Sequence, residues 1–283
     1  MFDAKLTHAV ENFAALILPL SEKDLEREWI WQDHDEEGIR FACFVTLQEL
    51  RHLAVKLDAQ RIRQTSAQHI LSQYHAAYMD LQAALFGLSE EDADKVPAEG
   101  EWQVRHVYAH ILSADINFTI TVRYALEKHR VAAWNPDRVS DEDENRLAGM
   151  SEEEYQALLK GPFERILAYH RDFHPDIINE FSSITDDELD LPSTFWEETR
   201  FPIRHRLHRY EAHYTQHTIQ IDKTLDAIGN TPTESMRLIR LLYAALAEAE
   251  GMMIGAEKTE SAVMLATADS IEDRTKLISA LLK

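Results

Sequence analysis

Glycine, proline and cysteine are all scarce in this chain. Its 283 residues include eight glycines, eight prolines and one cysteine. Sheet-rich folds such as β-sandwiches and α/β barrels need many turns, so this scarcity favours long helices with few connections. Cys43, the single cysteine, has no partner for an intramolecular disulfide, which favours a cytoplasmic location.

Basic residues and long apolar runs are also in short supply. Lysine and arginine number 29 against 50 aspartates and glutamates, for a net charge of −21. Such a surface repels phosphate backbones, so no nucleic-acid partner is expected. No apolar run reaches the roughly 18 residues of a transmembrane helix, and the acidic N-terminal segment does not resemble a signal peptide, so no membrane partner is expected.

Several common enzyme motifs are missing. The sequence has no G-x-G-x-x-G fingerprint, no Walker A loop, no G-x-S-x-G elbow and no H-E-x-x-H pair. These motifs mark dinucleotide binding, nucleotide binding, serine hydrolysis and zinc proteolysis. The chemistry must therefore be sought in less specific patterns.

The apolar residues recur with a helical period along most of the chain. The region 65–228 carries four long helices joined by loops, the pattern of a four-helix bundle, and the connection after the second helix is long enough to be a crossover. We therefore predict an all-α fold in which residues 61–230 form the bundle, and 1–60 and 231–283 form helical extensions packed on it. The predicted helical segments are 5–20, 37–58, 65–87, 102–129, 151–181, 203–228, 233–255 and 259–282.

Histidines four residues apart occur three times among the fourteen histidines of the chain. The pairs are His106/His110, His170/His174 and His213/His217. Residues four apart lie on one face of a helix, so two imidazoles so placed can bind one metal ion. Because two ligands rarely suffice, His213/His217 on the last bundle helix needs a third ligand from another helix.

The apolar stripes leave two partners open for that pair. His110 borders the stripe of its helix, whereas His106 lies further towards solvent. His170 and His174 both fall on the apolar side of theirs. A histidine near an apolar face is more often a hydrogen-bonded core residue than a ligand, and Pro175 disturbs the helix beside His174. From periodicity alone, either His110 or His170/His174 could complete the site.

Two segments resemble those of a known family. Residues 102–111 read W-Q-V-R-H-V-Y-A-H-I and residues 211–221 read E-A-H-Y-T-Q-H-T-I-Q-I. They are similar to the W-x-V-R-x-V-x-x-H-L and E-x-H-x-x-x-H-x-x-Q-I segments of the DinB-like (YfiT-like) superfamily, and the resemblance spans roughly residues 65–228. The chain departs from the family at His106, where relatives often have a carboxylate, so His106 is either an accessory ligand or a surface contact.

The resemblance implies a four-helix bundle with a crossover and an open three-histidine metal site. Carried over to this chain, the ligands are His110, His213 and His217. Imidazole ligands suit several divalent ions, with Zn or Ni expected first and Fe or Mn as alternatives. Three imidazoles with one open position are typical of a catalytic site.

The resemblance also implies what such a site does. Relatives include metal-dependent thiol S-transferases and hydrolase-type proteins, so a small-molecule substrate is expected, such as a low-molecular-weight thiol. The alternative is a non-catalytic metal-binding or stress-associated interaction protein. Relatives often pair through bundle helices, which predicts a homodimer. Specificity for a substrate is expected to reside in the loops 89–100, 130–150 and 184–202.

Overall fold

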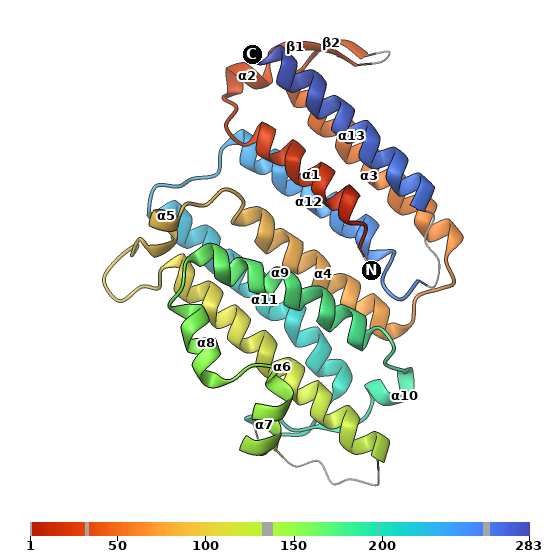
Figure 1. The fold of residues 1–283 in the computed structure, drawn as a ribbon, viewed down its shortest axis with the longest axis vertical. Helices are drawn as coiled ribbons and strands as arrows, with labels where there is room; N and C mark the ends of the chain where they lie inside the picture. The colour runs from red at the N-terminus through yellow and green to blue at the C-terminus, as the bar shows by residue number, and fades with distance from the viewer. Residues whose placement is uncertain (1, 32–33, 132–137, 198, 257–260) are drawn as a thin grey trace. The chain divides into compact units, whose positions relative to one another are not determined.

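The computed structural model describes residues 2–31, 34–131, 138–197, 199–256 and 261–283. Within these ranges the chain forms thirteen helices and four short strands, which confirms the predicted all-α fold (Figure 1). No helix among the described residues is both long and apolar enough to cross a membrane. Part of the predicted loop 130–150, residues 132–137, lies outside the described residues.

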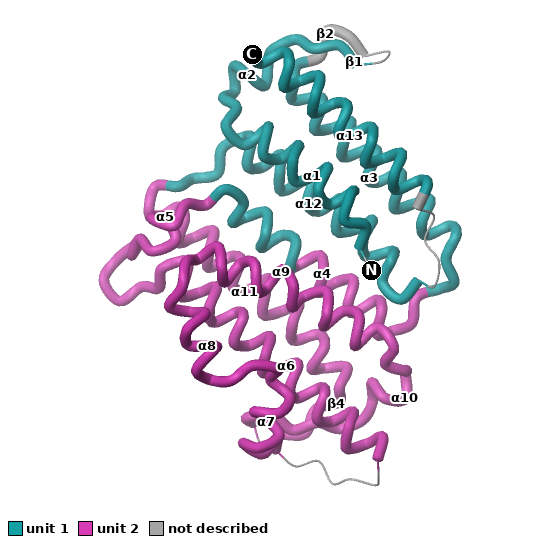
Figure 2. Tube along the Cα trace, in the orientation of Figure 1, with its two compact units in different colours: residues 1–63, 78–87, 230–283 teal, residues 64–77, 88–229 magenta. Residues whose placement is uncertain are grey.

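The chain divides into two compact units (Figure 2). Unit 1 comprises Met1–Arg63, Tyr78–Gly87 and Asn230–Lys283, and unit 2 comprises Gln64–Ala77 and Leu88–Gly229. The N-terminal and C-terminal segments thus belong to one unit. Helix α4 (Ser66–Ala84) contributes to both. The division into 1–60, 61–230 and 231–283 stays a prediction.

Unit 2 contains the predicted bundle. Its long helices are the first part of α4, α6 (Val104–Val131), α9 (Phe163–Phe181) and α11 (Ile203–Ala227). Helix α6 packs against both α9 and α11. The connection from α6 to α9 is the longest of the bundle and carries two short helices, α7 (Asp141–Ala148) and α8 (Glu152–Leu159).

The helix predicted over 151–181 is two helices. Helix α8 ends at Leu159, and α9 begins after Pro162, which occupies the N-cap position. Pro162 has no backbone N–H, so it cannot donate a helical hydrogen bond that would extend α8. At the start of α9 this N–H is not needed, because the first N–H groups of a helix have no partner within the helix. Pro175, in contrast, lies inside α9, and the helix continues through it.

The loops of unit 2 contain short elements that the sequence pattern did not predict. They are α7, in the predicted loop 130–150, α5 (Glu90–Asp94), α10 (Asp186–Leu189) and the hairpin of β3 (Pro192–Ser193) with β4 (Phe201–Pro202). The buried guanidinium of Arg206, on α11, donates to Ser193 and pairs with Glu197. This contact attaches the hairpin to the first turn of α11.

Unit 1 is also mainly helical. It contains α1 (Ala4–Ile17), α2 (Glu22–Leu25), α3 (Ile39–Gln60), α12 (Glu234–Gly251) and α13 (Ser261–Leu281). Helix α1 packs on α13 and α12, and α3 packs on the same two helices. The segment before α3 is a hairpin of β1 (Glu28–Trp31) and β2 (His34–Gly38), two strands that the all-α prediction did not include.

The core of unit 1 holds a buried cation. Arg274 on α13 is fully buried, donates to Thr46 and Glu49 of α3, and lies 4.9 Å from the ring centroid of Trp31. The indole of Trp29 donates to the Gly38 carbonyl oxygen at 3.0 Å, which closes the hairpin. The tryptophans of this segment thus belong to the packing of unit 1.

Candidate metal centre

Three imidazoles from two helices of unit 2 converge on one point. His110 comes from α6, and His213 and His217 come from consecutive turns of α11. One nitrogen of each ring lies within 4.8 Å of a nitrogen of the other two. The ring centroids are 5.0 Å apart for His110 and His213, 4.8 Å for His110 and His217, and 4.3 Å for His213 and His217.

The nitrogen spacing suits a tetrahedral ion. The Nε2 atoms of His110 and His213 lie 3.2 Å apart. Two nitrogens bound to a tetrahedral zinc ion at about 2.0–2.1 Å are separated by about 3.3–3.4 Å. The two rings therefore stand at nearly the separation that a shared metal ion requires, with only a small adjustment of side chains.

Gln220 orients the third ring. Its side-chain oxygen lies 2.8 Å from Nδ1 of His217, one turn earlier on α11. An amide oxygen accepts a hydrogen bond, so Nδ1 carries the proton and Nε2 keeps its lone pair. Histidine ligands usually donate their second N–H to such an acceptor, which fixes both tautomer and ring orientation.

Two of the rings, those of His110 and His213, are held in the neutral form that binds metals. His213 and His217 are buried, and His110 is partly exposed. Burial, reinforced by the neighbouring His217 and His110, lowers the pKa of His213 to about 3. Burial and the nearby His217 and His106 also lower the pKa of His110. At neutral pH these two rings therefore offer lone pairs rather than competing protons.

His106 lies outside the cluster, at its edge. Its ring stacks on the indole of Trp102 with a centroid separation of 4.3 Å and an interplanar angle of 7°. The same indole meets His110 edge-on at 5.6 Å. Of the two roles considered for His106, the stacked and exposed position favours the surface contact. Trp102 thus supports the exposed side of His110.

His170 and His174 belong to a buried polar network in the bundle core. His170 lies 2.8 Å from the Tyr108 hydroxyl, 2.6 Å from that of Tyr214 and 3.2 Å from the Asp115 carboxylate. His174 lies 3.0 Å from Nδ1 of His75 on α4. The structure therefore brings His110, and not His170/His174, to the pair on α11.

Acid is expected to weaken the protein through His174. Burial lowers the pKa of this histidine well below its ordinary value, and His75 and His170 lower it further. The unfolded chain binds a proton at His174 below about pH 6.5, and the folded chain does not. The free energy of unfolding should therefore fall as the pH drops below this value, by about 1.4 kcal/mol per pH unit for this one proton.

Urea unfolding between about pH 7 and pH 5 measures this effect. The variant His174→Gln should have a smaller slope of stability against pH than the wild type. His106→Gln, which changes an exposed histidine, should leave the slope unchanged. If the free energy of unfolding fell equally with pH in the wild type and in His174→Gln, the buried His174 ring would not be the cause of the acid sensitivity.

The number of candidate ligands bears on the kind of metal site that the cluster could form. Among the described residues, the cluster has three candidate protein ligands, His110, His213 and His217. Structural zinc sites fill all four positions with protein, whereas catalytic sites keep one for water or substrate. His110 is the partly exposed member of the cluster, and His213 and His217 are buried.

Comparison with known proteins agrees with this geometry. The model of the DinB superfamily matches residues 73–221, more than half of the chain, and this range includes all three clustered histidines. No curated protein and no solved structure matches the chain. Proteins of this superfamily are generally associated with metals. The chain therefore belongs to the DinB superfamily.

Proposed function

We propose that this protein binds one divalent metal ion through His110, His213 and His217. The observation that carries the proposal is the 3.2 Å separation of Nε2 of His110 from Nε2 of His213, with His217 oriented beside them by Gln220. Neutral imidazoles at this spacing favour Zn or Ni, and Fe or Mn are the alternatives.

The ion would serve a metal-dependent reaction on a small molecule, of the thiol S-transferase or hydrolase type. A divalent ion with an open position lowers the pKa of a bound water or thiol, so that a nucleophile forms near neutral pH. The three imidazoles would hold the ion, and His110 is the partly exposed one of the three. The three-ligand set favours this role over a non-catalytic one.

Metal titration of chelator-treated protein tests the site. Calorimetry with Zn²⁺ and with Ni²⁺ should give one ion per chain. Zinc binding should also raise the thermal transition, because an ion that binds only the folded state stabilises it. The site is refuted if neither ion binds and neither shifts the transition.

A turnover assay tests the reaction separately. Metal-loaded protein would be incubated with a panel of low-molecular-weight thiols and electrophiles, and with ester and amide substrates. We expect turnover that depends on the added metal and is lost with a chelator. Metal binding without turnover across the panel would support the non-catalytic alternative.

Gln220 is expected to tune the affinity for metal. Gln220→Ala removes the acceptor of the His217 Nδ1–H, and the loss of such a partner typically weakens metal binding about 10- to 100-fold. Gln220→Glu keeps an acceptor and should retain most of the affinity. Gln216→Ala, an exposed position on the same helix, is the matched control. An unchanged zinc affinity in Gln220→Ala would contradict the assigned role.

A further inference from the structure

Arg209 is an exposed arginine one helical turn before His213 on α11. Residues four apart on a helix share one face, so Arg209, His213 and His217 form one row of side chains. Four residues span about 6 Å along a helix axis. The Arg209 side chain therefore starts close to the proposed metal site without being one of its candidate ligands.

A buried ring of α6 contacts both Arg209 and His213. The guanidinium carbon of Arg209 lies over the ring of Phe118, 5.8 Å from its centroid. The same ring meets the His213 ring edge-on, with 5.8 Å between the centroids and 85° between the planes. A guanidinium over an aromatic face is attracted by the ring, which favours this position of a long side chain. The charge of Arg209 is thus held one ring away from His213.

The charge of Arg209 has no acidic partner among the residues that the structure describes. The other two arginines of α11 are both paired, Arg204 with Asp190 at 3.2 Å and Arg206 with Glu197. The whole chain carries 50 acidic residues against 29 basic ones, so acids for further pairs are plentiful. An arginine left without an acid beside a candidate metal centre is available to an anionic ligand.

Arg206 shows what a structural arginine does in this region. It is buried, donates to the Ser193 hydroxyl at 3.0 Å and lies 5.2 Å from the ring centroid of Phe201, so it attaches the β3–β4 hairpin to α11. Arg209, in contrast, is exposed and donates no hydrogen bond to a described residue of that hairpin. The hairpin therefore does not depend on the guanidinium of Arg209.

A guanidinium beside a metal site suits a substrate that has an acidic group at one end. Guanidinium N–H donors match the two oxygens of a carboxylate and form charge-assisted hydrogen bonds with them. One guanidinium balances the single charge of a carboxylate, whereas a phosphate carries about −1.5 to −2 at neutral pH and calls for a second cation. The negative charge of the whole protein repels anions, so a local cation is needed to favour a carboxylate here.

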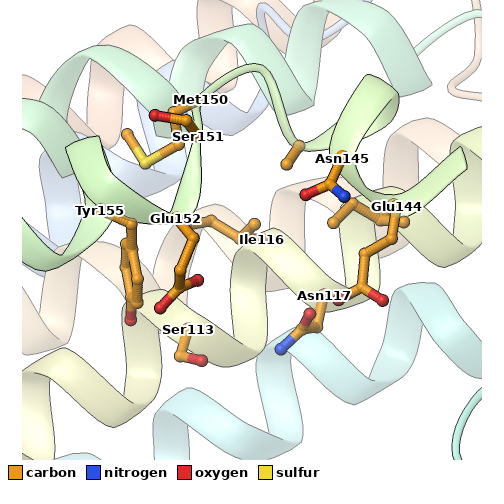
Figure 3. A pocket seen from close by; sticks show the side chains of 11 residues that line it. Ser113, Ile116, Asn117, Glu144, Asn145, Met150, Ser151, Glu152 and Tyr155 are labelled. Carbon is orange, nitrogen blue, oxygen red and sulfur yellow. The ribbon is translucent and has the colours of Figure 1, made fainter. Parts of the chain in front are cut away.

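The cleft between α6, α7 and α8 is not an alternative site for such an anion. It has a volume of about 180 Å³ and is lined by the exposed carboxylates of Glu144 and Glu152 (Figure 3). None of the described residues that line it is a lysine or an arginine. Like charges repel, so a carboxylate ligand is disfavoured there. The anion is therefore placed at Arg209 and not in this cleft.

We propose that Arg209 is a specificity-determining residue, which binds the carboxylate of a small substrate whose other end reaches the metal ion. The inference rests on the proposed metal function and narrows its substrates to molecules with an acidic group. Arg209 selects the substrate by charge and takes no part in holding the ion. Its replacement should therefore change which molecule binds and leave the affinity for metal within a few-fold of the wild type.

Two matched thiols test the proposal on nickel-loaded protein. 3-Mercaptopropionate carries a carboxylate, and 3-mercaptopropionamide is its neutral counterpart of nearly the same size. A thiolate bound to Ni²⁺ gives a charge-transfer absorption, so a titration at low ionic strength yields a dissociation constant for each thiol. Arg209→Gln should reduce the preference for the acid over the amide by about fivefold, because one charge-assisted contact is lost at an exposed site. High salt should lower the preference of the wild type in the same direction.

Lys223→Gln is the matched control for this measurement. It removes an exposed cation from the same helix, outside the row of Arg209, His213 and His217. It should keep the wild-type preference, because screened surface charges contribute little. The ratio of the two dissociation constants is compared between variants, which cancels any intrinsic difference between the two thiols. An unchanged ratio in Arg209→Gln, or an equal change in Lys223→Gln, would overturn the proposal.

Measuring the bound nickel first separates this inference from the metal function. Wild type and Arg209→Gln should each bind one Ni²⁺ per chain, and circular dichroism should show the same fold, because Arg209 is exposed. A wild type that binds no nickel would refute the metal function, and the role of Arg209 with it. Nickel binding with an unchanged preference, or with no binding of the acid to the wild type, would overturn the role of Arg209 alone.

Discussion

Zinc binding is expected to weaken by about 10²–10³-fold when His213 is replaced by alanine. Four-ligand zinc sites contribute about 10–16 kcal/mol of apparent binding energy, or roughly 2.5–4 kcal/mol per ligand. His213 is one of the three proposed ligands, and its Nε2 lies 3.2 Å from that of His110. Calorimetric titration with Zn²⁺, with a competing chelator for the wild type, measures the change.

Two other histidines serve as controls for this experiment. His208→Ala changes an exposed residue of the same helix, and His106→Ala changes the exposed residue one turn before His110. Both should keep the wild-type affinity within a few-fold. Because alanine at a buried position also lowers stability, the folded fraction of His213→Ala must be established first by circular dichroism. A folded His213→Ala with undiminished zinc affinity would remove this ring from the site.

The largest loss of stability is expected from Asp115→Ala. The Asp115 carboxylate is fully buried and accepts hydrogen bonds from the hydroxyls of Tyr74, at 2.9 Å, and Tyr214, with His170 at 3.2 Å. Removing it leaves these three buried groups without their shared partner. Breaking a buried charged network in this way costs about 3–5 kcal/mol.

Urea unfolding measures the difference. Asp115→Asn keeps an acceptor at the same place and should cost less, about 1–2 kcal/mol. Asp176→Ala, an exposed carboxylate on α9, should change stability by no more than about 0.5 kcal/mol. If Asp115→Ala were as stable as Asp176→Ala, the network would not hold the bundle together.

The network also bears on the metal centre. It joins α6, which carries His110, to α11, which carries His213 and His217. Asp115 lies five residues after His110, and Tyr214 follows His213 directly. The relative position of the two helices sets the distance between the proposed metal ligands, so a folded Asp115→Asn should bind zinc less tightly than the wild type.

The helical architecture could be predicted because it depends on local regularities. Apolar residues at helical spacing and the scarcity of glycine and proline placed α6 and α11 within two residues of their observed ends. The β1–β2 hairpin was missed, because its stability comes from contacts such as the Trp29–Gly38 hydrogen bond and not from an alternating pattern. Helix α7 was missed because its residues are almost all polar and it has no buried side chain.

The sequence by itself determined that His213 and His217 share a face of one helix, since spacing along a helix is a local property. It left the partner open between His110 and His170/His174, and only the resemblance to a family pointed to His110. The tertiary structure decided that His110 lies across from the pair, while His170 lies among Asp115 and two tyrosines. Which residues from different helices meet is determined by the rotation and register of the packed helices. Rotation and register depend on many side chains at once, so the spacing within one helix does not determine them.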